Sequence, residues 1–408
     1  MPEESYITWR KKKMINEYYK EMTGKGSVIR EFFTYANARA AEIGKENIVN
    51  FSLGNPSVPT PQEFTDYMKE LLENEDPVAL HGYSPTLGKD STREAIAASL
   101  NRRFGMNYGK EHIFPTTGAA GAIAHAVRCV VKEGDEVITF APYFPEYNPY
   151  IEGAGAVLKV VPADIETFQI NFDAFLEMMN EKVAAVLINS PNNPSGIVYS
   201  TETITRLADI LREKQEEYGH EIFLLTDEPY REIVFAGTDS PFVSKFYDNS
   251  ICCYSFSKSL SLPGERIGYV AVNPKAKDAE YIVPMCGQIS RFTGHNCPPS
   301  IIQLAVEKVL DITSDLSIYE RNADKLYREL TRIGYHIVKP GGTFYMFPRA
   351  LTGDANEFCW RAARELNLII VPSDSFRVPG HFRISYCVTE DVVEQSIPLF
   401  EKLYEMYS

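Results

Sequence analysis

Between about residue 80 and residue 272, short apolar runs rich in β-branched residues alternate with amphipathic helical stretches. Strands that are almost continuously apolar are typical of a sheet buried on both faces. Helices between successive strands favour parallel pairing, with the helices covering both faces of the sheet. The pattern therefore predicts an α/β fold around a mostly parallel sheet. We expect strands at residues 136–140, 157–161, 183–189, 222–226, 251–254 and 268–272, and helices at residues 91–104, 121–132 and 201–217.

The pattern changes after residue 297, where a long helical stretch over residues 299–333 precedes short strands and further helices. This arrangement predicts a second, smaller α+β domain. The first 50 residues are helical with glycine interruptions, and we expect them to pack on this domain. We therefore divide the chain into an N-terminal arm with part of the small domain (1–50), a large domain (51–297) and a C-terminal small domain (298–408). Within the small domain we expect strands at 335–338, 343–347 and 382–385, and helices at 356–366 and 390–407.

Charge and cysteine usage narrow the classes of function. The chain carries 41 Lys and Arg against 55 Asp and Glu, a net charge of −14, and so acidic a surface repels nucleic-acid phosphates. Seven scattered cysteines without a Cys-x-x-Cys pair predict reduced thiols and no metal site. The chain start lacks the apolar segment of a secretory signal, and the longest apolar runs have the length of strands. We expect a soluble, cytoplasmic protein without a nucleic-acid or membrane partner.

The most informative stretch runs from Tyr254 to Gly268 and reads Y-S-F-S-K-S-L-S-L-P-G-E-R-I-G. It follows a predicted buried strand, so Lys258 is expected to be partly desolvated, which lowers the pKa of an amine and makes it nucleophilic. Ser255, Ser257 and Arg266 are the donors that a phosphate dianion requires. Taken alone, Lys258 also fits a serine-rich turn with a solvated lysine.

Two further strand ends carry polar groups. Asp227, in L-L-T-D-E-P-Y, directly follows an apolar run, where a carboxylate can pair with a protonated ring nitrogen, and Tyr230 reaches the same place. Asn193 lies in the tight loop N-S-P-N-N-P-S-G, whose amides can donate to a phenolate oxygen. Taken singly, the aspartate also fits a turn cap and the loop an ordinary turn.

The stretch T-T-G-A-A-G, which contains Gly118, Ala119 and Ala120, opens a predicted helix with small residues. Free N–H groups and the helix dipole make such a helix start an anion site, although close packing alone explains small residues equally well. Together, the four strand ends require one ligand with a phosphate, a basic ring nitrogen, a phenolic oxygen and an aldehyde. Pyridoxal phosphate has all of these groups, and its usual partners are a lysine and an acid.

At these residues the chain resembles fold-type-I pyridoxal-phosphate enzymes, and within them the class I/II aminotransferases typified by aspartate aminotransferase. The resemblance extends from N-F-S-L-G-N-P at 50–56 to F-R-I-S-Y at 382–386. Its most specific motif is S-x-S-K followed by P-G-x-R-x-G, supported by N-N-P-S-G and D-E-P-Y.

The resemblance implies a role for each matching residue. Lys258 would hold the cofactor as a Schiff base and move the substrate proton, while Asp227 would keep the ring nitrogen protonated. Asn193 and Tyr230 would bind the phenolic oxygen. The phosphate would be bound by Gly118, Ala119, Ala120, Ser255, Ser257 and Arg266.

The resemblance also implies contacts around the ring and the substrate. Phe144 matches the aromatic residue that stacks on the ring, with Tyr143 as the alternative, and Tyr83 matches a tyrosine that reaches the phosphate of a partner subunit. The latter match implies a homodimer. Arg383 would bind the substrate α-carboxylate, together with Asn193, through a bidentate pair. Gly54 would line the substrate side.

Several positions depart from the family pattern. Arg291 lies one residue out of register with the cation that binds the side chain of acidic substrates, and Ala120 stands where some relatives carry a lysine. Leu260 replaces the usual aromatic residue, and Glu265 beside Arg266 is unexplained. An acidic substrate is therefore neither supported nor excluded.

The expected function is transfer of the amino group of an L-amino acid (aspartate, alanine or an aromatic one) to a 2-oxo acid. A pyridoxal-phosphate-dependent carbon–sulfur lyase, or another Cα chemistry on the same fold, is the alternative. A non-catalytic binding protein is a third hypothesis, but intact Lys258, Asp227 and Arg383 argue against it.

Overall fold

The computed structural model describes residues 15–24 and 27–408, and its centre is a seven-stranded sheet. In spatial order the strands are β2 (Ile113–Thr116), β8 (Gly268–Val272), β7 (Ser250–Ser255), β6 (Phe223–Asp227), β5 (Val183–Asn189), β3 (Glu136–Phe140) and β4 (Val157–Val161). From β7 to β4 the strands are parallel, while β8 runs antiparallel to both of its neighbours. The predicted α/β fold with a mostly parallel sheet is confirmed.

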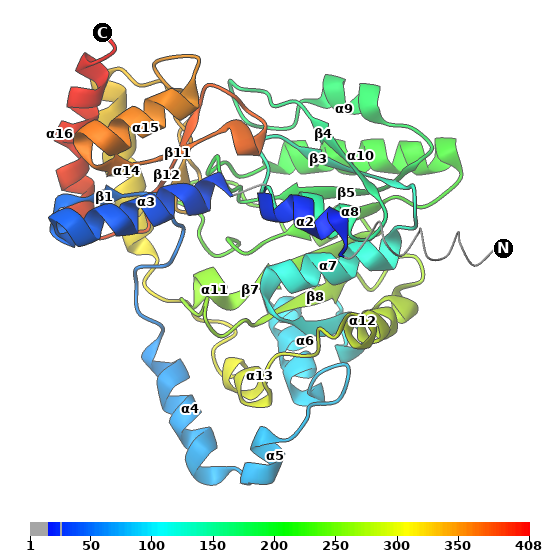
Figure 1. Ribbon diagram of the computed structural model, residues 1–408. Helices are drawn as coiled ribbons and strands as arrows, with labels where there is room; N and C mark the ends of the chain where they lie inside the picture. The colour runs from blue at the N-terminus through cyan, green and yellow to red at the C-terminus, as the bar shows by residue number, and fades with distance from the viewer. Residues whose placement is uncertain (1–14, 25–26) are drawn as a thin grey trace, which may run out of the picture.

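Helices pack on both faces of this sheet (Figure 1). One face carries α7 (Gly118–Val130), α8 (Tyr147–Glu152) and α12 (Ala279–Thr293), and the other carries α9 (Phe172–Met178) and α10 (Thr201–Tyr218). A further apolar cluster joins the sheet to α4 (Gln62–Asn74), α5 (Pro77–His81), α6 (Asp90–Phe104) and α13 (Ser300–Val306). Both faces of the central strands are therefore buried, which is why their sequences are almost continuously apolar.

The bounds of α10 follow from local chemistry. Ser200 precedes the helix, and its hydroxyl accepts a hydrogen bond from the Thr203 amide. Gly219 ends the helix with a φ of 71°, a left-handed conformation that glycine adopts without a steric penalty. The short helix α11 (Phe256–Ser259) begins in the same way, because the Ser255 hydroxyl accepts a hydrogen bond from the Ser257 amide. This cap ends β7 at Ser255 and places Lys258 in the helical turn that follows the strand.

The C-terminal part forms an α+β unit with two small sheets. The sheets comprise β1 (Val49–Asn50) with β10 (Leu368–Ile369), and β11 (Val371–Pro372), β12 (Phe382–Ser385) and β9 (Tyr345–Met346). The helices are α3 (Val28–Ile43), α14 (Ser317–Ile333), α15 (Ala355–Leu366) and α16 (Glu390–Glu405). Helix α2 (Glu17–Gly24) precedes α3, and its Glu21 and Met22 line a surface hollow with Phe144 and Glu152 of the large domain. Helix α3 packs on this unit, since its Phe32 stacks on Trp360 of α15 with ring centroids 4.3 Å apart.

Three expected elements differ from the structure. The helical stretch 299–333 is two helices, because Asp315 accepts hydrogen bonds from the amide and hydroxyl of Ser317 and so begins a new helix at that point. Residues 335–338, all described, form no strand; Pro340 follows them, and Tyr335 is buried in the C-terminal core. The strand expected at 343–347 shortens to β9, since Thr343 has a φ of 63°, which an extended strand excludes.

We retain the division into residues 1–50, 51–297 and 298–408 as a proposal. Helix α13 lies with α4 and α6 in one apolar cluster, which favours a later boundary, between α13 and α14. Within the described ranges, no helix has the length and apolar character needed to cross a membrane.

Candidate active site

The carboxyl ends of β5, β6 and β7 bring three of the predicted motifs together. The strand register pairs Asn189 with Asp227 and Asp227 with Cys253, so β7 extends two residues further, to Ser255. Loops beyond the carboxyl ends of parallel strands are where ligands bind in such sheets. These ends open into a cavity of about 300 Å³, and most of the predicted site residues line it. The predicted residues that line it are Gly54, Ala119, Ala120, Phe144, Asn193, Asp227, Tyr230, Ser255, Ser257, Lys258, Arg266 and Arg383.

Lys258 lies in α11, and its amine enters the cavity. The amine donates a 2.7 Å hydrogen bond to the Gly54 carbonyl and lies 5.4 Å from the centre of the Phe344 ring. Burial, with a smaller contribution from the charges of Arg266 and Arg383, lowers its pKa to about 8. About a tenth of the amine is therefore uncharged at pH 7, far more than for a solvated lysine, and this neutral form can attack a carbonyl carbon.

Asp227 ends β6 and is buried beneath the cavity. Its Oδ2 accepts a 2.6 Å hydrogen bond from the hydroxyl of Tyr147, while its Oδ1 has no partner among the described residues. Burial raises the pKa of this carboxyl to about 7, against the opposing effect of the Tyr147 hydrogen bond. A buried carboxylate oxygen without a partner is costly. A protonated ring nitrogen entering the cavity would supply the missing donor.

The start of α7 and the segment after α11 form a second polar wall. Ala119 and Ala120 line the cavity in the first turn of α7, where backbone N–H groups are free of helical partners. The guanidinium of Arg266 donates a 3.1 Å hydrogen bond to the Thr117 carbonyl, directly before this turn. Gly118 does not line the cavity, but its φ is 82° and a Cβ there would lie 3.0 Å from Arg266 Nη2. Glycine at this position therefore lets the arginine approach the helix start.

The two serines face the same wall. The Ser255 hydroxyl donates a 2.8 Å hydrogen bond to the Ser257 hydroxyl, and both line the cavity. Together with the first turn of α7 and Arg266, they form a cradle with the donor chemistry that a phosphate dianion requires. The structure offers no physical account of Glu265.

Arg383 lies on β12 of the small sheet, lines the cavity and is only 2% exposed. Its Nη1 donates to the side-chain oxygen of Asn193 at 3.1 Å, and its Nη2 donates to the Ser52 carbonyl at 2.7 Å. Its Nε has no partner among the described residues. A buried guanidinium with an unused donor is suited to bind a carboxylate, as the sequence predicts for this residue.

The two aromatic candidates for ring stacking have different environments. Phe144 lines the cavity and is half-buried. Tyr143 is buried in the sheet-side apolar cluster, and its hydroxyl accepts a hydrogen bond from Asn148. The geometry favours Phe144 over Tyr143.

Tyr83 is, apart from Gly118, the one predicted site residue that does not line the cavity. It is fully exposed. Instead it lines a surface hollow of about 720 Å³ together with Arg291. Within a single chain, Tyr83 and Arg291 therefore share a surface but reach none of the other site residues.

Sequence reasoning assigned no role to three side chains at this site. Tyr147 binds Asp227, the amide of Asn189 donates a 2.9 Å hydrogen bond to the Asp227 carbonyl, and Tyr345 lines the cavity beside Arg383. Asn189 was visible as the first residue of the N-S-P-N-N loop at a strand end. Tyr147 and Tyr345 carry no such signal, because their proximity to the site arises only when α8 and the small sheet pack against the large one.

Comparison with known proteins identifies the family. The family described as "Aminotransferase class I and II" matches residues 46–397 of the chain. The chain belongs to this family. An aromatic-amino-acid aminotransferase of Thermococcus litoralis is 30% identical over 92% of this chain and 95% of its own length. An aspartate aminotransferase of Thermotoga maritima is 29% identical over 90% and 94% of the two chains.

Solved structures of aminotransferases match the fold of this chain. An amino transferase from Eubacterium rectale is 48% identical, with a TM-score of 0.94 over 97% of this chain and all of that one. The crystal structure of the Thermotoga maritima aspartate aminotransferase has a TM-score of 0.84 over 93% of this chain and 97% of its own. The protein is an aminotransferase of the aspartate aminotransferase fold.

Aminotransferases of class I and II depend on pyridoxal phosphate, and the described residues fit this cofactor. Asp227 Oδ1 has no hydrogen-bond donor among them, so it is free to accept one from the protonated ring nitrogen of the cofactor. The Lys258 amine, whose pKa is lowered to about 8, can attack the cofactor's aldehyde carbon. The first turn of α7 with Ser255, Ser257 and Arg266 fits the phosphate. These groups surround one cavity, so a single ligand can engage all of them.

Proposed function

We propose that this aminotransferase moves the amino group of an L-amino acid to a 2-oxo acid, with aspartate, alanine or an aromatic amino acid as donor, in a step of amino-acid metabolism. One observation carries the proposal. The Lys258 amine, the unpartnered Asp227 Oδ1 and the unpartnered Arg383 Nε belong to residues that line the same cavity. A nucleophile, an acid for a ring nitrogen and a carboxylate binder in one cavity suit Cα chemistry on an amino acid.

The positions of these residues suggest a separate role for each of them in the proposed reaction. Bound pyridoxal phosphate supplies an electron sink for the electrons of the substrate Cα–H bond. Lys258, with a pKa of about 8, takes the proton from Cα and returns it during the transfer. Asp227 keeps the ring nitrogen protonated, and Arg383 with Asn193 orients the α-carboxylate. Tyr230 and Asn193 bind the phenolic oxygen, and Phe144 covers the ring.

The substrate side chain meets mainly apolar and aromatic groups within one chain. Ile29, Leu53, Phe144 and Tyr345 line the cavity together with the residues already assigned. Its lining cations within the described ranges are Lys258, Arg266 and Arg383, each of which has a proposed role. This wall supports alanine or an aromatic donor, in keeping with the name of the Thermococcus litoralis relative. Aspartate would require a cation from outside the chain.

We propose that the enzyme is a homodimer in which Tyr83 reaches the phosphate of the second copy. Its exposure is consistent with this role, and α4, α5 and α12 also expose large apolar side chains. Exposed examples are Leu72, Val78, Phe292, Tyr281 and Met285 on or beside α4, α5 and α12. Because Arg291 shares the hollow with Tyr83, a partner that supplies Tyr83 would bring Arg291 as well. That arginine is the candidate for binding the side chain of aspartate.

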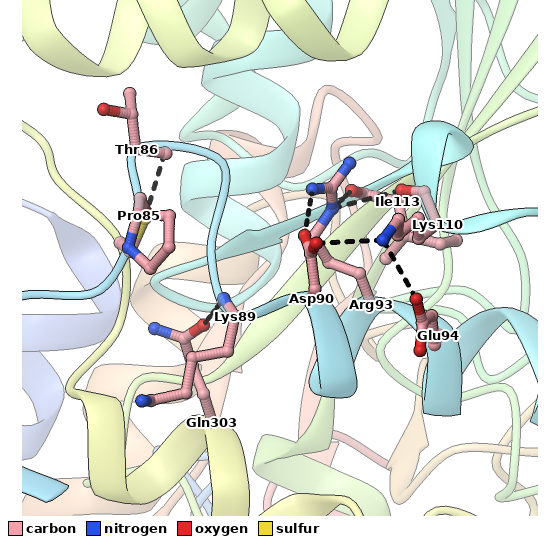
Figure 2. A network of polar contacts seen from close by, with 10 residues as sticks. Pro85, Thr86, Lys89, Asp90, Arg93, Glu94, Lys110, Ile113 and Gln303 are labelled. Atoms are coloured by element: carbon pink, nitrogen blue, oxygen red, sulfur yellow. Dashed lines mark hydrogen bonds and ion pairs between the residues drawn. The ribbon is translucent and has the colours of Figure 1, made fainter. Parts of the chain in front are cut away.

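The loop that carries Tyr83 is held rigidly in place, which supports a binding role. Figure 2 shows its end, where the Lys89 amide donates to Gln303 at 2.9 Å. The side-chain amide of Gln303 also donates to the Ser84 hydroxyl at 3.0 Å. An exposed tyrosine on a fixed loop loses little conformational entropy on binding a partner.

The beginning of α6 holds the same end of this loop in place. Asp90 accepts hydrogen bonds from Arg93 at 3.1 Å and from Lys110 at 2.9 Å (Figure 2). The buried Arg93 also donates to the Ile113 carbonyl at 3.0 Å, which ties α6 to β2 at the edge of the large sheet. The position of Tyr83 is thus set by the large sheet that also carries the cavity.

We further infer a cytoplasmic enzyme whose partners are small molecules. All seven cysteines are free, as a reducing compartment favours. The net charge of −14 disfavours nucleic acid as a partner.

The deciding experiment loads the protein with pyridoxal phosphate and mixes it with single amino acids in the absence of an oxo acid. We expect the visible absorption band of the bound cofactor to convert to the band of its amine form. Comparison of aspartate, alanine and phenylalanine as donors ranks the three proposed classes. A spectrum that no amino acid changes would contradict the proposed donors. Release of ammonia and pyruvate from cysteine or cystathionine at a comparable rate would favour the carbon–sulfur lyase.

A further inference from the structure

Tyr345 makes the one hydrogen bond to the Tyr230 hydroxyl that the described residues provide. The two hydroxyl oxygens are 3.2 Å apart, and the two rings meet edge to face with centroids separated by 5.7 Å. Both side chains are buried and line the cavity. The contact therefore lies at the site itself, in surroundings where water competes weakly for the hydroxyls.

Three separate segments create this contact. Tyr230 follows β6 of the large sheet, while Tyr345 lies on β9 of the small sheet, opposite Ser385 of β12. Gly54, in the loop after β1, leaves the space that the Tyr345 hydroxyl occupies, since a Cβ at Gly54 would lie 1.8 Å from that oxygen. The hydroxyl thus connects the C-terminal unit to the segment that follows β6, at the wall of the cavity.

Arg383 modifies the same tyrosine. Its guanidinium carbon lies 4.8 Å from the centre of the Tyr345 ring. Burial raises the pKa of Tyr345, and the positive charge of Arg383 opposes that rise. A cation over the ring makes the phenol a stronger hydrogen-bond donor.

The direction of the hydrogen bond depends on what Tyr230 binds. In the structure Tyr230 donates to Tyr345. Each phenol has one proton, so once Tyr230 donates its proton to a ligand oxygen, the pair persists only with Tyr345 as the donor. A hydroxyl that accepts a hydrogen bond becomes a stronger donor in turn.

We propose that Tyr345 is a positioning residue that donates a hydrogen bond to Tyr230 and thereby strengthens the hydrogen bond of Tyr230 to the cofactor's phenolic oxygen. The inference rests on the proposed role of Tyr230. It links the carboxylate-binding Arg383 to the cofactor ring through two phenols, without direct contact between Tyr345 and the reacting atoms.

The test is a pH titration of the visible absorption band in the holoenzyme. Replacing Tyr345 by phenylalanine weakens the donor beside the phenolic oxygen, so the negative charge on that oxygen is less well stabilised. We expect the pH midpoint of the band to rise by roughly half a unit to one unit in Tyr345→Phe. KM for the amino acid should change by less than about twofold, because the ring beneath Arg383 remains.

Tyr335→Phe is the matched control. Tyr335 is also buried and its hydroxyl donates to the Phe400 carbonyl, but it lies in the C-terminal core and does not line the cavity. The Tyr335→Phe variant should be less stable than the parent protein, with an unchanged pH midpoint of the absorption band. A ring-fluorinated tyrosine at position 345, which is a stronger donor, should shift the midpoint in the opposite direction to Tyr345→Phe. A purely structural role for Tyr345 would produce neither shift.

Tyr230→Phe tests the role of Tyr230 separately from the role of Tyr345. If Tyr230→Phe raises the midpoint but Tyr345→Phe and the fluorinated variant leave it unchanged, the inference about Tyr345 is wrong and the role of Tyr230 stands. If Tyr230→Phe also leaves the midpoint unchanged, the proposed role of Tyr230 is wrong. Opposite shifts in the two Tyr345 variants, together with a rise in Tyr230→Phe, are the result that supports the inference.

Discussion

Lys258 combines a chemical role with a small structural one. Its amine makes one hydrogen bond, to the Gly54 carbonyl, and its long side chain passes over Phe344. Lys258→Ala removes the proposed base and the proposed cofactor attachment, so we expect amino transfer to fall by more than roughly 10⁴-fold. The fold should persist, with a circular-dichroism spectrum like that of the parent protein. A variant that stayed fully active with amino acids would overturn the assignment of Lys258.

Asp227 gives the cofactor-free protein a pH-dependent stability. Its folded-state pKa of about 7 lies above the value of about 3.9 expected for an unfolded chain. The carboxyl therefore contributes stability below about pH 4, and this contribution is lost as the pH rises towards 7. The side chain of Asp227→Asn remains neutral at every pH. The free energy of unfolding of the cofactor-free variant, relative to that of the parent protein, should therefore rise by on the order of 2 kcal/mol between pH 5 and pH 8.

Thermal unfolding of both cofactor-free proteins at pH 5 and pH 8 measures this difference. The sign should reverse when pyridoxal phosphate is bound, because the ring nitrogen then pairs with the parent carboxylate and not with an amide. A stability difference that is the same at both pH values would show that Asp227 does not titrate in this range.

Gly118 begins helix α7 and leaves room for Arg266 beside the helix start. Gly118 has a φ of 82° at the helix start, and a Cβ there would lie 3.0 Å from Arg266 Nη2. Gly118→Ala should therefore lose about 1 kcal/mol of stability from backbone strain and also displace the arginine. We expect pyridoxal phosphate to bind about tenfold more weakly.

Gly134→Ala is the control for this prediction. Gly134 has a φ of 87°, but nothing lies within 4 Å of the position its Cβ would take. It should lose similar stability and bind the cofactor like the parent protein. Equal cofactor dissociation constants for both variants, measured by fluorescence titration, would mean that the approach of Arg266 to α7 is unimportant.

At the scale of the whole molecule, the separation of Tyr83 from the cavity leads to a mixing experiment. We expect a Lys258→Ala chain and a Tyr83→Ala chain each to be impaired alone. If Tyr83 acts on the second copy, a mixed dimer contains one site with an intact Lys258 and an intact Tyr83. We expect the mixed dimer, purified from co-expressed chains, to show about half the activity of the parent dimer and tight cofactor binding at one site per dimer. Activity no greater than the sum of the two variants would place Tyr83 within its own chain's site or outside the chemistry.

Much of this fold follows from the sequence alone. The apolar runs of β3, β4 and β5 have the predicted limits, because strands buried on both faces leave an unbroken apolar signature. The sequence predicts that Lys258, Asp227 and Asn193 lie together, because each stands at or just after the end of such a strand and the carboxyl ends of parallel strands meet at one edge. Strand β2 was missed, since Pro115 within it weakens the strand signal of a short run.

What only the tertiary structure decided involves contacts between segments that are distant in the sequence. The hydrogen bond of Tyr147 to Asp227, that of Tyr230 to Tyr345, and the choice of Phe144 over Tyr143 depend on how α8 and the small sheet pack on the large one. Local residue patterns report which face of a strand or helix is buried, but not which distant side chain meets it there. The sequence therefore determined the sheet, the lysine and the acid, and packing determined the hydroxyl groups that tune them.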